Sequence, residues 1–131
     1  FGLPEARWGI IANAGGTTRV ARAMLLGIVM KLILTAGRIG AQEALHYGLV
    51  SDVVPRDQLL AKAEEIANAI LGNGPLAVRA AKEGVMRGLE MSVDDSLELG
   101  VSLGAFLRTT EDAKEGPKAF AEKRTPNFQA R

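Results

Sequence analysis

The feature that most constrains the fold is a series of helix patterns that begins at Asp57. From Leu59 to Leu71, apolar residues recur on one face and charged residues on the other, which is typical of an amphipathic helix. The stretch 72–75, GNGP, combines residues that end one helix and start another. We therefore expect a second helix over residues 76–89.

Two more helices are predicted after this pair, each by a hydroxyl residue at its start. Ser92 is expected to cap a helix that runs to about Arg108. Thr110 is expected to cap a last helix over 111–124, which has acidic residues in its first turn and ends before Pro126. From Asp57 onward the chain is thus predicted to be a run of antiparallel helices.

Composition excludes several classes of function. The 131 residues carry 16 basic and 15 acidic side chains, and this net charge of +1 is not typical of proteins that bind nucleic acid or a membrane surface. The chain has no cysteine and one histidine, His46, so neither a thiolate nor a histidine metal site is expected. No apolar run approaches the length of a membrane span.

The opening stretch, FGLPEARWGIIANAGGTTR, places one carboxylate, Glu5, among apolar residues and directly after Pro4. A Gly-Gly pair follows, and Thr17 is expected to cap a helix. A carboxylate in apolar surroundings beside a helix start is a candidate proton-transfer group, because apolar surroundings disfavour its ionised form. The alternative is a solvated glutamate in the first turn of a helix, with Gly15 and Gly16 forming only a tight turn.

The residues between these two regions give weaker patterns. Residues 19–34 are expected to form one or two helices divided near Gly27. A short helix over 40–47, ended by Gly48, is then followed by a β-like run over 49–54 that stops at Pro55.

Four segments together resemble the crotonase (enoyl-CoA hydratase/isomerase) superfamily. They are FGLPE–WGII–AGGTTR at the start, LILTAGRIGAQEALHYGLVSDVVP at 32–55, GPLAVRAAKEGV at 74–85 and TTEDAKEGPKAFAEKRTPNF at 109–128. The resemblance covers essentially the whole chain, with the segments in family order. It implies an α/β crotonase-like fold in the full protein, of which this chain is the C-terminal half.

The resemblance also implies how this half is organised. Residues 1–55 are expected to be the C-terminal part of the acyl-CoA-binding core, the tail end of a ββα spiral, and residues 56–131 a helical oligomerisation domain. The chain itself is therefore expected to be mainly α-helical. Crotonase-like proteins use the C-terminal helices to build trimers, commonly paired into hexamers, so a homo-trimer or hexamer is expected.

The activity implied is hydration or isomerisation of an acyl-CoA thioester, with Glu5 matching the family's second active-site glutamate. Two backbone N–H groups stabilise the thioester enolate in such enzymes, while carboxylates move protons. The first glutamate and these N–H groups lie upstream of this segment in the family, so the segment alone is expected to be inactive. Asn13 stands where family members usually have glycine. Its side chain is expected to intrude on the place where hydratases hold the attacking water. Isomerase or other crotonase-type lyase or hydrolase reactions therefore stay open as alternatives.

The resemblance further implies a set of substrate-binding residues: Trp8, Asn13, Gly15, Phe120 and Lys123. Phe120 and Lys123 are expected on one helix face near the nucleotide end of CoA, which belongs to the substrate, so no separate cofactor and no metal are expected. We expect a cytoplasmic enzyme. The alternative function, of a different class, is a non-catalytic helical assembly module in which Glu5 has only a structural role.

Overall fold

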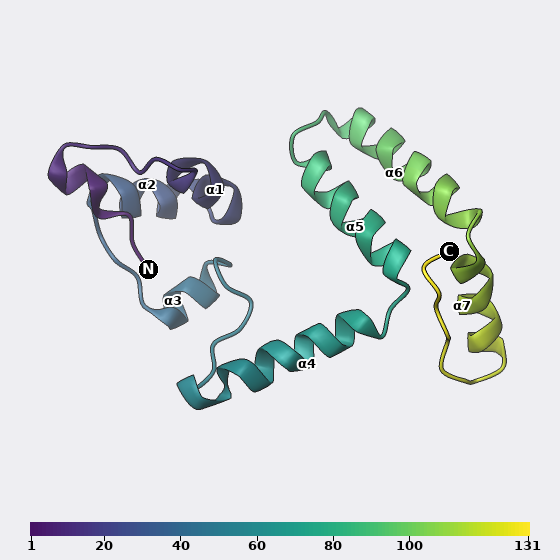
Figure 1. Cartoon of the computed structure of the whole chain (residues 1–131). Coiled ribbons are helices and arrows are strands. Elements are labelled where there is room, and N and C mark those ends of the chain that lie inside the picture. The colour runs from purple at the N-terminus through teal and green to yellow at the C-terminus, as the bar shows by residue number, and fades with distance from the viewer. The chain divides into compact units, whose positions relative to one another are not determined.

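The computed structural model describes all residues from 1 to 131, and contacts divide them into two compact units, Phe1–Leu59 and Leu60–Arg131 (Figure 1). This division falls close to the boundary that we predicted between residues 55 and 56. The functional roles that we predicted for the two parts, substrate-binding core and oligomerisation domain, stay predictions.

The first unit consists of short helices around a small apolar core. Met24, Val29 and Leu32 are buried at its centre, with partly buried apolar residues packed around them. Burial of such side chains is the main favourable contribution to its folding. The elements are η1 (Pro4–Trp8), α1 (Gly16–Ala23), α2 (Leu26–Leu34), α3 (Ala41–His46) and η2 (Arg56–Gln58).

Two details of the predicted helices in this unit need correction. The stretch 19–34 does form parts of two helices, but the break falls at Met24, whose extended backbone carries its side chain into the core, and not at Gly27. Thr17 is not a helix cap either, since α1 begins at Gly16 after a left-handed Gly15 and has no side-chain cap. The prediction for Gly48 is confirmed, because it follows α3 with φ of 76°.

The β-like run at 49–54 does not form a strand. A strand needs a partner to pair its N–H and C=O groups, and the sole β-bridge of the chain joins Gly2 and Arg38 in antiparallel orientation. Around this bridge, the backbone nitrogen of Phe1 donates to the carbonyl of Ile39 at 2.7 Å and the nitrogen of Ile39 donates back to Phe1 at 2.9 Å.

The second unit confirms the four predicted helices, but the close antiparallel packing is confined to the pair over 75–88 and 93–108. Ser92 and Thr110 cap their helices as expected, since their hydroxyl oxygens accept from the backbone nitrogens of Asp95 and Ala113 at 3.1 and 3.2 Å. Such caps satisfy N–H groups that have no partner inside the helix. The elements, beginning at the junction of the two units, are α4 (Leu59–Leu71), α5 (Pro75–Gly88), α6 (Val93–Arg108) and α7 (Glu111–Ala121).

Helices α5 and α6 form an antiparallel pair that packs closely (Figure 1). A methyl group on Gly88 would meet the hydroxyl oxygen of Ser96 at 2.5 Å, and one on Gly84 would lie 3.5 Å from Leu103. Glycine at position 88 therefore helps the two helices to approach, which offsets its low helix propensity. The distance at Gly84 is that of an ordinary contact. None of the helices combines the length and the apolar character needed to cross a membrane.

The residues after α7 fold back against the start of that helix. The carboxylate of Asp112, which is buried, accepts hydrogen bonds from the backbone nitrogens of Gln129 and Ala130 at 2.6 and 2.9 Å. In return, the carbonyl of Arg131 accepts from the nitrogens of Glu111 and Asp112, at 2.7 and 3.2 Å. The tail thus satisfies N–H groups in the first turn of α7 that no helical carbonyl reaches.

Candidate active site

Glu5 lies in the short 3₁₀ helix η1, which packs against α2 in the first unit. Pro4 occupies the first turn, where its fixed φ favours a helix and its missing N–H costs nothing. Gly9 ends the helix with φ of 70°, and its nitrogen donates to the carbonyl of Ala6 at 3.2 Å. The local sequence PEARWG therefore explains why Glu5 stands on a rigid single turn.

The carboxylate of Glu5 has one oxygen, Oε2, that is shielded from solvent and has no hydrogen-bond partner in the chain. Leaving a buried polar atom unpaired costs about 1–3 kcal/mol. Such an atom in a native structure needs an explanation, and catalytic use is among the recognised ones. This carboxylate oxygen is the feature of the first unit that most favours acid–base chemistry.

The turn before α1 carries the next two predicted residues, Asn13 and Gly15. The carbonyl of Asn13 accepts from the nitrogen of Gly16 at 3.0 Å, and the side chain of Asn13 is exposed. The left-handed residues of this turn are Ala14 and Gly15, with φ of 54° and 85°. Ala14 rarely adopts this conformation without support from its surroundings.

Arg19 supplies that support, and the sequence interpretation missed it. Its guanidinium donates to the carbonyl of Ala14 at 2.5 Å, and its backbone nitrogen donates to the carbonyl of Gly15 at 2.8 Å. Glycine suits position 15 because its φ of 85° is strained for any other residue, and a methyl group there would also require the guanidinium of Arg19 to move. The sequence did contain a signal for this role of Arg19: an arginine placed one turn into a helix that follows a Gly-Gly turn.

A cavity of about 420 Å³ lies beside this turn. Gly15 and Arg19 line it together with apolar side chains, whereas Glu5, Trp8 and Asn13 do not. Trp8 is 75% exposed in this chain, and its substrate-binding role stays a prediction. The apolar lining consists of Phe1, Leu3, Val20, Ala23, Leu32 and Leu49.

The remaining two predicted residues, Phe120 and Lys123, belong to the second unit. Helix α7 ends at Ala121, not at Arg124, and Lys123 follows in left-handed conformation with φ of 54°. The expectation that Phe120 and Lys123 share a helix face is therefore wrong. The side chain of Phe120 is 86% exposed, and Lys123 is exposed as well.

The structure thus places Glu5, Trp8, Asn13 and Gly15 in the first unit and Phe120 and Lys123 in the second. No group of three or more His, Asp or Glu side chains is arranged to hold a metal ion. The candidate for acid–base chemistry in the first unit is therefore the carboxylate of Glu5, whose Oε2 is shielded and unpaired.

Comparison with known proteins identifies the family to which this chain belongs. All 131 residues match the enoyl-CoA hydratase/isomerase family. The chain is 41% identical over 131 residues to an enoyl-CoA hydratase of Mycobacterium tuberculosis and 40% identical over 131 residues to the 2,3-dehydroadipyl-CoA hydratase of Escherichia coli. It covers 49% and 51% of these proteins, and they cover all of it.

Solved structures agree with the sequence comparison. The crystal structure of an enoyl-CoA hydratase from Bacillus anthracis superimposes with a TM-score of 0.96 at 44% identity, over 99% of this chain and 50% of that one. The fold is therefore that of the crotonase class. The chain belongs to the enoyl-CoA hydratase/isomerase family, and it spans about half the length of the curated relatives that it matches.

Proposed function

We propose that the full-length protein hydrates 2-enoyl-CoA thioesters, with Glu5 as an acid–base group. The observation that carries this proposal is the shielded, unpartnered Oε2 of Glu5 in a chain that belongs to this family. Both curated relatives described above are named as hydratases of CoA thioesters. The acyl group is not specified by these residues.

The proposed reaction adds the elements of water across the double bond. The oxygen of water bonds to the β carbon while the π electrons move onto the thioester, which two backbone N–H groups of the rest of the protein stabilise as an enolate. A carboxyl group delivers a proton to the α carbon, and a carboxylate accepts the proton that water loses. Glu5 takes part in this transfer with a second carboxylate outside this segment.

We propose, from the resemblance, that the second carboxylate and the N–H groups precede Phe1, so that the segment is the C-terminal half of a family-length chain and is inactive alone. The coverage of about half of each relative is compatible with either half. The coding sequence decides the matter: a glycine-rich segment with an acidic residue about twenty positions before Glu5 supports the proposal, whereas a family-like continuation only after Arg131 contradicts it.

The experiment that tests the role of Glu5 is its replacement in the full-length protein. Glu5→Gln should lower turnover of 2-enoyl-CoA by about 10²–10⁴-fold, the usual scale for a positioned acid–base group. Glu43→Gln is the matched control, because Glu43 only caps α3 through Gly40, at 3.0 Å, and glutamine keeps that bond. Activity of Glu5→Gln within threefold of wild type would favour the assembly module, in which Glu5 is structural.

Isomerisation is the second candidate, and Asn13 favours it. Its side chain is exposed on the turn that follows η1, at the position where hydratases of the family are expected to hold water. An isomerase needs only to move a proton between carbons, so displacement of that water would not impair it. Asn13→Gly should then raise hydration relative to isomerisation, and an unchanged ratio of products would argue against this role.

For substrate binding we propose Trp8, Asn13 and Gly15 near the acyl-pantetheine part, and Phe120 and Lys123 at the nucleotide end. Lys123→Ala should weaken acyl-CoA binding by about 1–2 kcal/mol, in the range of a charge-assisted hydrogen bond. The effect should fall on KM more than on kcat and should be smaller for an acyl-pantetheine substrate. An equal loss on both substrates would reduce Lys123 to a helix-end residue.

We also propose that the full-length protein assembles as a trimer or hexamer in the cytoplasm, with no cofactor beyond the CoA of its substrate. The support is the set of large apolar side chains that the helices of the second unit leave exposed, since such surfaces often mark interfaces. Light scattering should give a trimer or hexamer, and a clean monomer at micromolar concentration would contradict the proposal. The exposed residues include Leu60, Leu71, Val85, Val93, Leu97 and Val101.

A further inference from the structure

Lys123 occupies the backbone position after α7 where helices usually have glycine. Its nitrogen donates to the carbonyl of Phe120 at 3.2 Å, and the nitrogen of Arg124 donates to the carbonyl of Ala119 at 3.1 Å. These two bonds form the Schellman arrangement, which satisfies carbonyls at the helix end and requires a left-handed residue. A lysine with φ of 54° is disfavoured here by the contact of its Cβ with the backbone.

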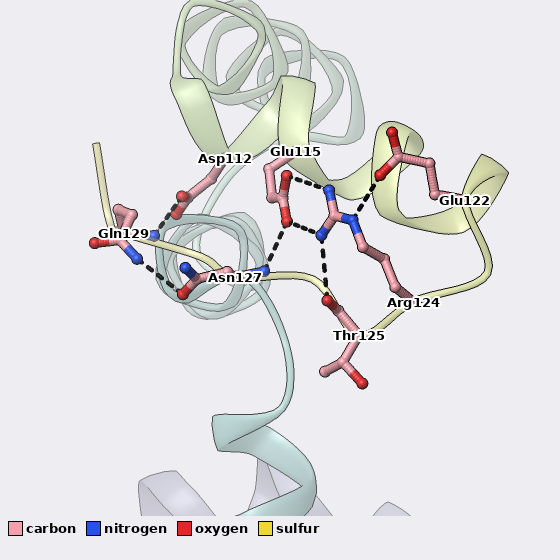
Figure 2. Close-up of polar contacts among 7 residues, drawn as sticks. All are labelled: Asp112, Glu115, Glu122, Arg124, Thr125, Asn127 and Gln129. Carbon is pink, nitrogen blue, oxygen red and sulfur yellow. Dashed lines mark hydrogen bonds and ion pairs between the residues drawn. The ribbon is translucent and has the colours of Figure 1, made fainter.

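The guanidinium of Arg124 ties both neighbours of Lys123 to the body of the helix (Figure 2). Nη1 and Nη2 bind the two carboxylate oxygens of Glu115 at 2.5 and 2.9 Å, and Nε binds Glu122 at 2.6 Å. Glu115 also accepts from the backbone nitrogen of Asn127 at 2.8 Å. The residues just before and just after Lys123 are therefore held by a single network centred on Arg124.

This network differs from the ordinary ion pairs on the same helix. The side chains of Glu115 and Arg124 are 21% and 38% exposed, whereas those of Glu111 and Lys114, paired at 2.8 Å, are 64% and 68% exposed. A two-point bond between a planar guanidinium and a carboxylate fixes orientation as well as distance. The Arg124 hydrogen bonds and the Asn127 amide lower the pKa of Glu115 from 4.5 to about 2, so this carboxylate stays ionised at neutral pH.

We propose that Glu115 and Arg124 are positioning residues that hold the turn of Lys123 so that its ammonium group is presented to the nucleotide phosphates of CoA. The inference rests on the proposed function, and it adds two residues that touch no substrate. Because the turn needs an unfavourable backbone conformation, it persists only while its surroundings hold it. Without the network, Lys123 keeps its charge but loses its fixed position.

The test compares KM for an acyl-CoA and for the matching acyl-pantetheine in full-length variants. Glu115→Gln should raise KM for acyl-CoA by about threefold to tenfold, up to about 1.4 kcal/mol of binding, with kcat and the pantetheine substrate unchanged. Arg124→Lys should behave in the same way, because lysine keeps the charge but not the two-point bond. Glu111→Gln is the matched control: it removes one carboxylate from the exposed pair of the same helix and should leave both substrates unaffected.

Two further variants separate this inference from the proposed function. If Lys123→Ala raises KM for acyl-CoA, adding Glu115→Gln to it should have no further effect, because both changes remove one interaction. If Lys123→Ala has no effect, the nucleotide contact in the proposed function is wrong. If Lys123→Ala has an effect but Glu115→Gln and Arg124→Lys do not, or if they change both substrates equally, the positioning role is wrong. Hydrogen exchange at residues 123–127 should be faster in Glu115→Gln than in Glu111→Gln, and equal exchange would also overturn it.

Discussion

Replacing Lys123 by glycine should make the full-length protein more stable and a poorer binder of acyl-CoA. Left-handed backbone costs a non-glycine residue about 1–2 kcal/mol, and Lys123 has φ of 54°. Glycine removes this cost but loses about 0.4–1 kcal/mol through the greater freedom of the unfolded chain. The net gain is therefore about 0.5–1 kcal/mol, which corresponds to a rise of roughly 1–4 °C in Tm for a protein of this class.

The assay is thermal unfolding of Lys123→Gly beside Lys123→Ala, together with KM for acyl-CoA. Alanine removes the same charge but keeps the left-handed cost, so its Tm should stay near that of wild type. Both variants should raise KM for acyl-CoA by about fivefold to thirtyfold, the equivalent of 1–2 kcal/mol. The reasoning fails if Lys123→Gly is less stable than Lys123→Ala, because the turn would then not be strained by its lysine.

Three further predictions follow from contacts in the two units. Asp112→Ala should lower the free energy of unfolding by about 2 kcal/mol in urea titrations, because the amides of Gln129 and Ala130 lose a charged acceptor; a loss below about 0.5 kcal/mol would contradict this. The stability advantage of wild type over Glu115→Gln should be full above about pH 4.5 and disappear as pH falls towards 2, since the folded-state pKa of Glu115 is lowered to about 2; an advantage that persists at pH 2 would disagree. Arg19→Met should speed hydrogen exchange at residues 14–16 by at least about tenfold, with partial recovery in Arg19→Lys, and unchanged exchange would show that the turn holds without Arg19.

Helices α4 to α6 were predictable because the signals that define them are local. Apolar periodicity indicated each helix, although the apolar faces of α4 and α6 contain no buried residue in this chain. The Ser92 hydroxyl bonds only three residues away. The end of α7 was not predictable on the same basis. A lysine in left-handed conformation depends on Glu115 and on the chain beyond residue 124, and pairs across nine or twelve residues leave no periodic trace.

The β-like run at 49–54 is a second case in which a local pattern was not enough, because here the pattern predicted an element that the structure lacks. Its composition favours a strand, but β-propensity reflects packing against neighbouring strands more than an intrinsic backbone preference, and no partner strand is present in the chain. The sequence indicated Glu5, Asn13 and Gly15 as candidates because they are close in sequence, and their roles stay predictions. The contribution of Arg19 depends on the left-handed conformation of Ala14, which sequence patterns did not indicate.

The most direct test of the central claim is the product that the full-length protein forms from 2-enoyl-CoA in water labelled with heavy oxygen. Mass spectrometry should find a 3-hydroxyacyl-CoA with one labelled oxygen on the β carbon. Under the same conditions Glu5→Gln should form this product at least about a hundredfold more slowly. An unlabelled product with a displaced double bond would contradict hydration, and equal rates in wild type and Glu5→Gln would contradict the role of Glu5.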